Sequence, residues 1–244
     1  MHLFRDEKEK RVSGAVIVEA GRNLLVRADF SKKGAHRNFG LKTVIQACLS
    51  GDEGASATKE VCNNIRSQLE QYHISSFDIS DVLKALFETQ PFIALDIFLL
   101  PESLCHHIDL FDVGTPVEVI DEKHLKEWAD RDPDERYPLL GECLSMFGKN
   151  NDDESKDISP LFLSMLDSAP DKQRFLGDYY PRLHPRSWGG SLAVILEHRK
   201  TKLIKLAELV DEEVKRWVND AMPELDSWIE KERGCERGRE ESFE

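Results

Sequence analysis

The sequence has no hydrophobic run that is long enough to cross a bilayer. Its longest apolar stretch, from Phe92 to Leu100, is interrupted by Asp96, whereas a membrane-spanning helix needs about 20 apolar residues. The first residues, MHLFRDEKEKR, also lack the apolar core of a signal peptide. We therefore expect a cytoplasmic protein that does not enter a membrane.

Positive charge is in the minority. Lysine and arginine number 33 against 46 aspartates and glutamates, which gives a formal net charge of -13 at pH 7. Such a chain repels a phosphate backbone unless its basic residues gather on one face. The composition therefore disfavours nucleic acid as a partner and favours a protein partner that carries a basic face.

Cysteine is scarce and odd in number. The five cysteines lie far apart, at Cys48, Cys62, Cys105, Cys143 and Cys235. A scattered set of this kind does not form a disulfide framework. We interpret the cysteines as reduced structural thiols.

The common catalytic motifs are missing as well. No serine sits in a Gly-x-Ser-x-Gly turn, and no Walker or dinucleotide loop is present. The densest set of potential metal ligands is Cys105-His106-His107, followed by Asp109 and Asp112. Adjacent histidines point in different directions on any regular element, and no second Cys/His pair lies at zinc-site spacing. We therefore predict no catalytic residue, cofactor or metal from these patterns.

What the sequence does contain is a series of amphipathic helical patterns. Hydrophobic residues make up 40% and charged residues 32%, as expected when many helices each keep one face in water. One helix is predicted from position 56 to about position 72. Its apolar residues share a face: Val61, Ile65, Leu69 and Tyr72.

The segment between positions 12 and 28 is ambiguous. It predicts a helix whose inward residues are Val16, Ile17, Leu24 and Leu25. A β-branched run at positions 16–18 and two glycines weaken that prediction, so a strand is the alternative. We expect this N-terminal part to be irregular.

Helix starts recur along the rest of the chain. Asp134, Asp171 and Asp211 are 37 and 40 positions apart, and Pro91 lies 43 before Asp134. Each start is preceded by another apolar helical pattern, and a period near forty is typical of two-helix solenoid repeats. A single hairpin buries only one face and must stack on its neighbours. The pattern therefore predicts an all-α fold, an α-solenoid of stacked helical hairpins.

The last of these helices carries a resemblance. The pattern Asp-x-x-Val-Lys-Arg-x-Val-x-x-Ala-x-x-x-Leu at 211–225 resembles the second helix of a HEAT-type repeat, and Asp134-x-Arg136 begins a looser copy. The resemblance implies a HEAT-like fold and a role in binding macromolecules. The segment 185–193 is similar to C-terminal helical regions of large bacterial multidomain proteins, which implies a part of a larger defence or signalling protein.

Three regions follow from these patterns. We expect an N-terminal helical segment over 1–76 and HEAT-like hairpins over 77–229. A tail over 230–244 is dense in glutamate and arginine and has too few apolar residues to pack alone, so we expect it to be frayed or disordered.

The most distinctive local feature is the segment Pro185-Arg186-Ser187-Trp188-Gly189-Gly190-Ser191. It combines a fixed turn, an aromatic side chain and Ser191 as an expected helix N-cap. Arg186 and Trp188 are the predicted protein-binding residues, because tryptophan and arginine are typical interface anchors. The alternative is that Trp188 folds back and fills the join between two repeats.

One enzymatic alternative stays open. Positions 117–123 predict a strand that ends in Asp121-x-Lys123, the arrangement in which a metal-dependent nuclease places a carboxylate and a lysine beside a phosphate. Asp109 or Asp112 would supply the second carboxylate. Against this, Asp121 is also a natural N-cap for the helix that follows.

The sequence as a whole thus favours an interaction or sensor module that presents a helical-repeat surface to a protein partner, rather than an enzyme. A structural protein whose only partner is itself is a third interpretation. The partner's identity, the pathway and the oligomeric state do not follow from the sequence.

Overall fold

The computed structural model describes residues 7–32, 40–100, 116–147, 158–177, 183–185 and 188–242, with side chains from 14 to 238. Within these ranges the chain forms α-helices and short 3-10 helices and no strand, apart from an isolated antiparallel bridge between Phe147 and Ile158. The all-α prediction is confirmed. No helix in this part of the chain combines the length and apolar character that a membrane crossing requires.

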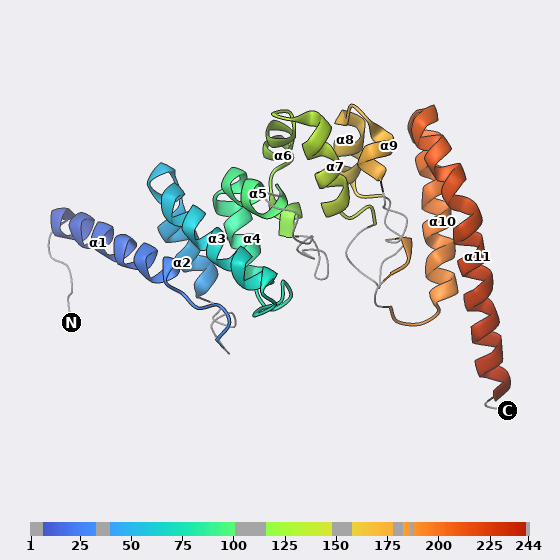
Figure 1. Cartoon of the computed structure of the whole chain (residues 1–244), viewed down its shortest axis with the longest axis horizontal. Coiled ribbons are helices and arrows are strands. Elements are labelled where there is room, and N and C mark those ends of the chain that lie inside the picture. Colours follow the sequence, from blue (N-terminus) through green and yellow to red (C-terminus); the bar gives the residue numbers. More distant parts are fainter. Residues whose placement is uncertain are drawn as a thin grey trace. The chain divides into compact units, whose positions relative to one another are not determined.

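The chain divides into two compact units, 1–128 and 129–244. The elements of the first unit are α1 (Glu7–Val26), α2 (Leu41–Leu49), η1 (Asp52–Gly54), α3 (Ala55–Glu70), α4 (Ser80–Thr89), α5 (Pro91–Leu99), η2 (Pro116–Val119) and α6 (Glu122–Ala129), whose last residue belongs to the second unit. Helix α2 packs against α4, α3 against α5, and α1 against both α2 and α3 (Figure 1). Segment 1–76 therefore shares one unit with the α4–α5 hairpin.

The core of the first unit comes from one face of each helix. Val61 and Ile65 of α3 are fully buried, and Leu69 is nearly so, as their spacing predicts. Cys62 lies in the same core, where burial raises the pKa of its thiol to about 12. The part expected to be irregular is thus helical at α1, α2 and α3.

Helix α1 is oriented differently from the prediction. Only Leu25 of the four expected inward residues is buried, whereas Val16, Ile17 and Leu24 are 64%, 62% and 73% exposed. Gly21 faces α2 so closely that a Cβ there would lie 2.4 Å from the Cys48 sulfur. The helix packs on the unit through the face of Gly21 and Leu25, which leaves its other apolar face outward.

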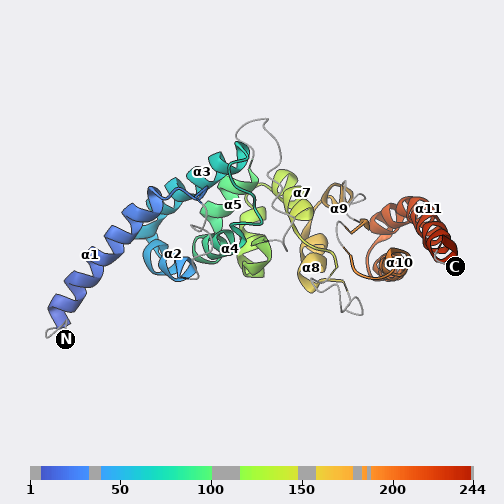
Figure 2. The same ribbon diagram turned by 90° about the horizontal axis from the view of Figure 1, so that it is seen from below.

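The second unit contains α7 (Pro133–Cys143), α8 (Pro160–Ser168), α9 (Lys172–Leu176), α10 (Leu192–Leu209) and α11 (Glu212–Ser242). Helix α7 packs against α8 and α9, α9 packs against α11, and α10 and α11 form a hairpin whose helices lie side by side in both views (Figures 1 and 2). The buried residues of α11 recur every three or four positions: Val214, Val218, Ala221, Leu225 and Ile229. Such spacing places them on one face, toward α10.

Residues 230–242, assigned above to a frayed or disordered tail, continue α11 as a helix to Ser242. An ion pair between Arg233 and Glu197 joins this stretch to α10. Pro223 lies inside α11 without ending it.

The expected helix starts are confirmed. Pro91 and Pro133 occupy the first turns of α5 and α7, and Asp171 caps α9 by accepting a hydrogen bond from the Arg174 amide at 2.7 Å. Asp211 likewise accepts from the backbone amides that open α11. Helix α9 ends at Leu176, where Gly177 follows with a φ of 35°.

Successive second helices of the second unit are also joined at their starts. The Lys172 ammonium at the start of α9 lies 2.6 Å from the Asp211 carboxylate at the start of α11. This hydrogen bond from Lys172, together with those from the backbone amides, lowers the pKa of Asp211 below its ordinary value. The acid that begins α11 therefore both caps its own helix and binds the preceding one.

Candidate functional site

Trp188, the aromatic residue singled out in the sequence, lies just before α10 and is 45% exposed. Its ring makes an edge-to-face contact with His184 at a centroid distance of 5.8 Å. His184 makes a second edge-to-face contact, also at 5.8 Å, with Trp228 of α11. The Trp188 ring thus contacts His184, which in turn contacts Trp228 of α11, and nearly half of Trp188 stays exposed. Arg186, the other predicted residue, lies outside the described residues.

Local sequence explains how this segment is held. Ser191 accepts a hydrogen bond from the Val194 amide at 3.2 Å, which confirms it as the N-cap of α10. Gly190 adopts a φ of 77°, a conformation that glycine tolerates. On the other side, the Arg199 guanidinium donates to the Leu183 carbonyl at 3.0 Å and lies over the Phe147 ring. Both flanks of Trp188 are therefore fixed to α10.

The two interpretations of Trp188 differ in how much of the ring they bury. A residue that only fills a join between repeats would be sealed, whereas a binding anchor must present surface. The half-exposed ring retains enough surface for a partner to cover. Binding by Trp188 stays a prediction.

Asp121 and Lys123 of the nuclease alternative do not lie on a strand. Positions 116–119 form the 3-10 helix η2, and α6 begins at Glu122, so the predicted strand is wrong. The Asp121 carboxylate accepts a hydrogen bond from the Lys123 amide at 2.8 Å, as an N-cap does. Asp109 and Asp112 lie outside the described residues.

The potential metal ligands Cys105, His106 and His107 also lie outside the described residues. Across the described ranges, no three histidine, cysteine, aspartate or glutamate side chains come together in a group that could hold a metal ion.

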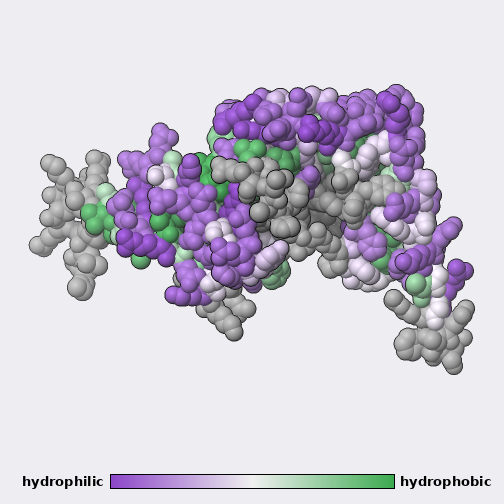
Figure 3. All heavy atoms as spheres, in the orientation of Figure 1, coloured by the Kyte–Doolittle hydropathy of each residue, from purple (hydrophilic) through white to green (hydrophobic). Residues whose placement is uncertain are grey.

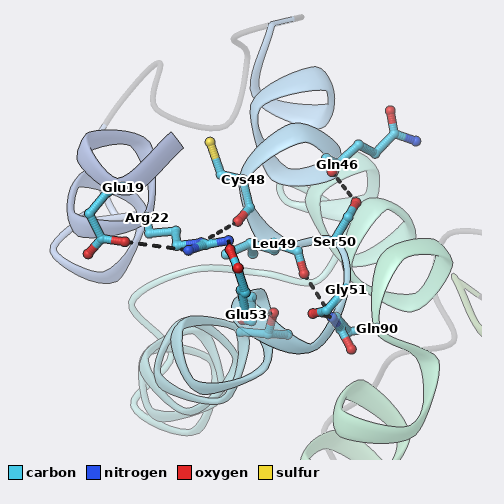
Figure 4. Close-up of polar contacts among 11 residues, drawn as sticks. Glu19, Arg22, Gln46, Cys48, Leu49, Ser50, Gly51, Glu53 and Gln90 are labelled. Carbon is cyan, nitrogen blue, oxygen red and sulfur yellow. Dashed lines mark hydrogen bonds and ion pairs between the residues drawn. The ribbon is translucent and has the colours of Figure 1, made fainter. Parts of the chain in front are cut away.

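A polar junction at the end of α2 joins three helices of the first unit (Figure 4). Arg22 of α1 donates from Nε to the Cys48 carbonyl at 2.7 Å, and its other nitrogens lie 3.4 and 3.5 Å from Glu19 and Glu53. Gln90, immediately before α5, donates from Nε2 to the carbonyls of Leu49 and Gly51 at 2.8 and 2.7 Å. The donors to Cys48 and Leu49 satisfy carbonyls that the end of α2 leaves without intrahelical partners. The junction stabilises the packing of α1, α2 and α5.

Two exposed hydrophobic surfaces were not predicted from the sequence patterns. The first is the outer face of α1, formed by Val16, Ile17 and Leu24. Figure 3 shows hydrophobic surface at the end of the molecule where α1 lies. The second is the α3–α4 loop, residues 71–79, where Tyr72 is 84% and Phe77 66% exposed. The cluster of serine and aspartate around Phe77 is the only local signal for its exposure.

No known family model, curated protein or solved structure matches this chain. The surfaces described above are therefore interpreted from their own chemistry.

Proposed function

We propose that this chain is a helical-repeat interaction module that binds a protein partner, with Trp188 as one anchor. The observation that carries the proposal is the state of that ring, which is half-exposed although His184 and, through it, Trp228 hold it in place. Binding a rigid aromatic side chain costs little conformational entropy, so anchors of this kind contribute strongly to affinity.

An α-solenoid arrangement is part of the proposal. In the first unit, α2 packs on α4 and α3 on α5, so equivalent helices of successive hairpins lie next to each other. In the second unit, α7 packs on α9 and α9 on α11 in the same way. Contacts between successive repeats are what a solenoid requires. The likeness to HEAT repeats and to large bacterial defence or signalling proteins stays a prediction from the sequence.

The proposed setting is the cytoplasm. Cys48, Cys62 and Cys143 are buried free thiols, and unpaired core cysteines are characteristic of proteins in reducing compartments.

Affinity capture with the full chain, followed by quantitative mass spectrometry, tests the function. We expect a protein partner that the Trp188→Ala variant recovers about 30-fold less well, the effect of losing an interface hot spot. Ile204→Ala is the matched control, because Ile204 of α10 is a large hydrophobic residue with a similar exposure of 46%. Circular dichroism confirms that both variants are folded.

Two results contradict the proposal. One is equal recovery of the partner by wild type and Trp188→Ala. The other is specific recovery of nucleic acid with no protein, which would reverse the expectation from the net charge of -13.

A further inference from the structure

The end of α3 is a Schellman motif with an unusual residue at its centre. The His73 amide donates to the Gln68 carbonyl at 2.9 Å and the Tyr72 amide to the Leu69 carbonyl at 3.0 Å. Tyr72 has a φ of 56° and is the one non-glycine residue with positive φ in the described part of the chain. Glycine is the usual residue at this position, because any Cβ is strained in the left-handed conformation. Tyrosine therefore destabilises this helix end relative to glycine.

Packing of the tyrosine ring does not offset this strain. The sequence pattern places Tyr72 on the buried face with Val61, Ile65 and Leu69, but α3 ends at Glu70 and Tyr72 turns outward. It is 84% exposed, so its ring gains little from burial within the fold. A strained aromatic residue whose ring stays in water points to a role outside the fold.

A second exposed aromatic ring and two exposed carboxylates follow Tyr72 within nine positions of the sequence. Phe77 is 66% exposed in the same loop, and neither lysine nor arginine occurs between 67 and 83. Asp78 accepts from the Ser75 hydroxyl at 3.1 Å, and Asp81 lies 3.9 Å from Lys84 with 82% of its own side chain exposed. The loop and the first turn of α4 thus combine exposed aromatic rings with accessible negative charge.

We infer that the α3–α4 loop is a docking surface for an arginine- or lysine-rich segment of a protein partner. A guanidinium or ammonium group is attracted to the faces of Tyr72 and Phe77, and the carboxylates of Asp78 and Asp81 match its charge. The inference rests on the proposed protein-binding function, but it concerns the first unit and is independent of Trp188. A nucleic acid is disfavoured here, because the same carboxylates repel phosphate.

The test uses the full chain and a fluorescent oligo-arginine peptide, with an oligo-glutamate peptide as the charge control. We expect the oligo-arginine peptide alone to bind. Tyr72→Gly is expected to weaken that binding about two- to fivefold, the range of an exposed cation–π contact. The same variant is expected to raise Tm by about 2–4 °C, because glycine relieves the backbone strain. Tyr72→Phe keeps the ring and is expected to bind like wild type.

A charge-matched pair separates a local site from general attraction to an acidic protein. Asp78→Asn with Asp81→Asn is expected to weaken binding, whereas Asp220→Asn with Glu224→Gln, which removes two exposed acids from α11, is not. Equal losses in the two double variants, or unchanged binding by Tyr72→Gly, would overturn the inference, as would failure of the wild type to bind the peptide. Trp188→Ala should bind the peptide normally, so failure of the inference is distinguishable from failure of the proposed function.

Discussion

Gly141 of α7 faces the backbone of Phe175 in α9 so closely that a Cβ at position 141 would lie 1.9 Å from the Phe175 carbonyl oxygen. No side-chain rotation relieves such an overlap, because the backbone fixes the position of a Cβ and the atom that it meets is a backbone oxygen. The two helices touch at the one residue type that permits it.

Gly141→Ala should therefore destabilise the second unit by about 3 kcal/mol, since one helix must shift away from the other. Urea denaturation followed by circular dichroism measures the loss. Gly189→Ala is the control, because a Cβ there meets nothing within 4 Å, and its effect should stay within about 0.5 kcal/mol. Equal stability of the two variants would show that α7 and α9 do not approach this closely.

Two adjacent leucines of α1 should respond in opposite ways. Leu25 is 3% exposed and Leu24 is 73% exposed. Leu25→Ala is expected to cost about 2–5 kcal/mol through lost burial and a residual cavity, whereas Leu24→Ala should change stability by less than about 0.5 kcal/mol. Chemical denaturation of both variants checks the orientation of α1. A larger loss at Leu24 would mean that the outer face is the packed one.

The hydrogen bonds from Gln90 should contribute measurably to the first unit. Gln90→Ala leaves the carbonyls of Leu49 and Gly51 without this donor, which should cost about 1–2 kcal/mol. Gln71→Ala is the matched control, because Gln71 donates only to the exposed Ser67 hydroxyl on its own helix. Denaturation midpoints compare the two, and an equal effect would argue that the junction at the end of α2 is dispensable.

Asp211 predicts how the link between α9 and α11 depends on pH. The hydrogen bond from Lys172 lowers the carboxyl pKa below its ordinary value of 3.8. Its contribution to stability is therefore fully present above pH 3.8 and is lost as pH falls through the lower pKa of the folded state. Lys172→Met should be less stable than wild type at neutral pH, and this difference should shrink below pH 3.8.

Asp211→Asn helps to interpret that pH series, because asparagine keeps a cap oxygen but carries no charge. Its stability relative to wild type should follow the same pH trend with a smaller amplitude. Denaturation at a series of pH values measures both variants. A difference between wild type and Lys172→Met that persists unchanged in acid would exclude the charged pair as its cause.

Helix starts could be predicted from the sequence because their signals are local. Pro91 and Pro133 fix the first turn of a helix, and Asp171 and Asp211 satisfy amides within three residues of themselves. The N-cap role of Ser191 could be predicted for the same reason, because its partner is the amide of Val194. A capping residue and its partner lie in one short window, so no tertiary contact is needed to recognise them.

Long-range side-chain partners and the orientation of α1 depend on tertiary contacts, which the sequence patterns do not reveal. Arg22 and its acceptor Cys48 are 26 positions apart, and no periodicity links them. Helix α1 is apolar on two faces, so its spacing alone does not decide whether Leu24 or Leu25 packs inward. Tyr72 continues the helical spacing of α3 but follows the turn that ends the helix, where backbone conformation overrides periodicity.

The burial of Cys62 makes its thiol a reporter of how often the first unit opens. A thiol-specific reagent can modify Cys235 on the surface of α11 at once, whereas Cys62 stays protonated and shielded until the first unit opens. The rate at which Cys62 is modified in native buffer therefore measures the frequency of local unfolding in that unit. If a bound partner stabilises the first unit, the same rate should fall, so thiol modification would detect binding without a label attached to the protein.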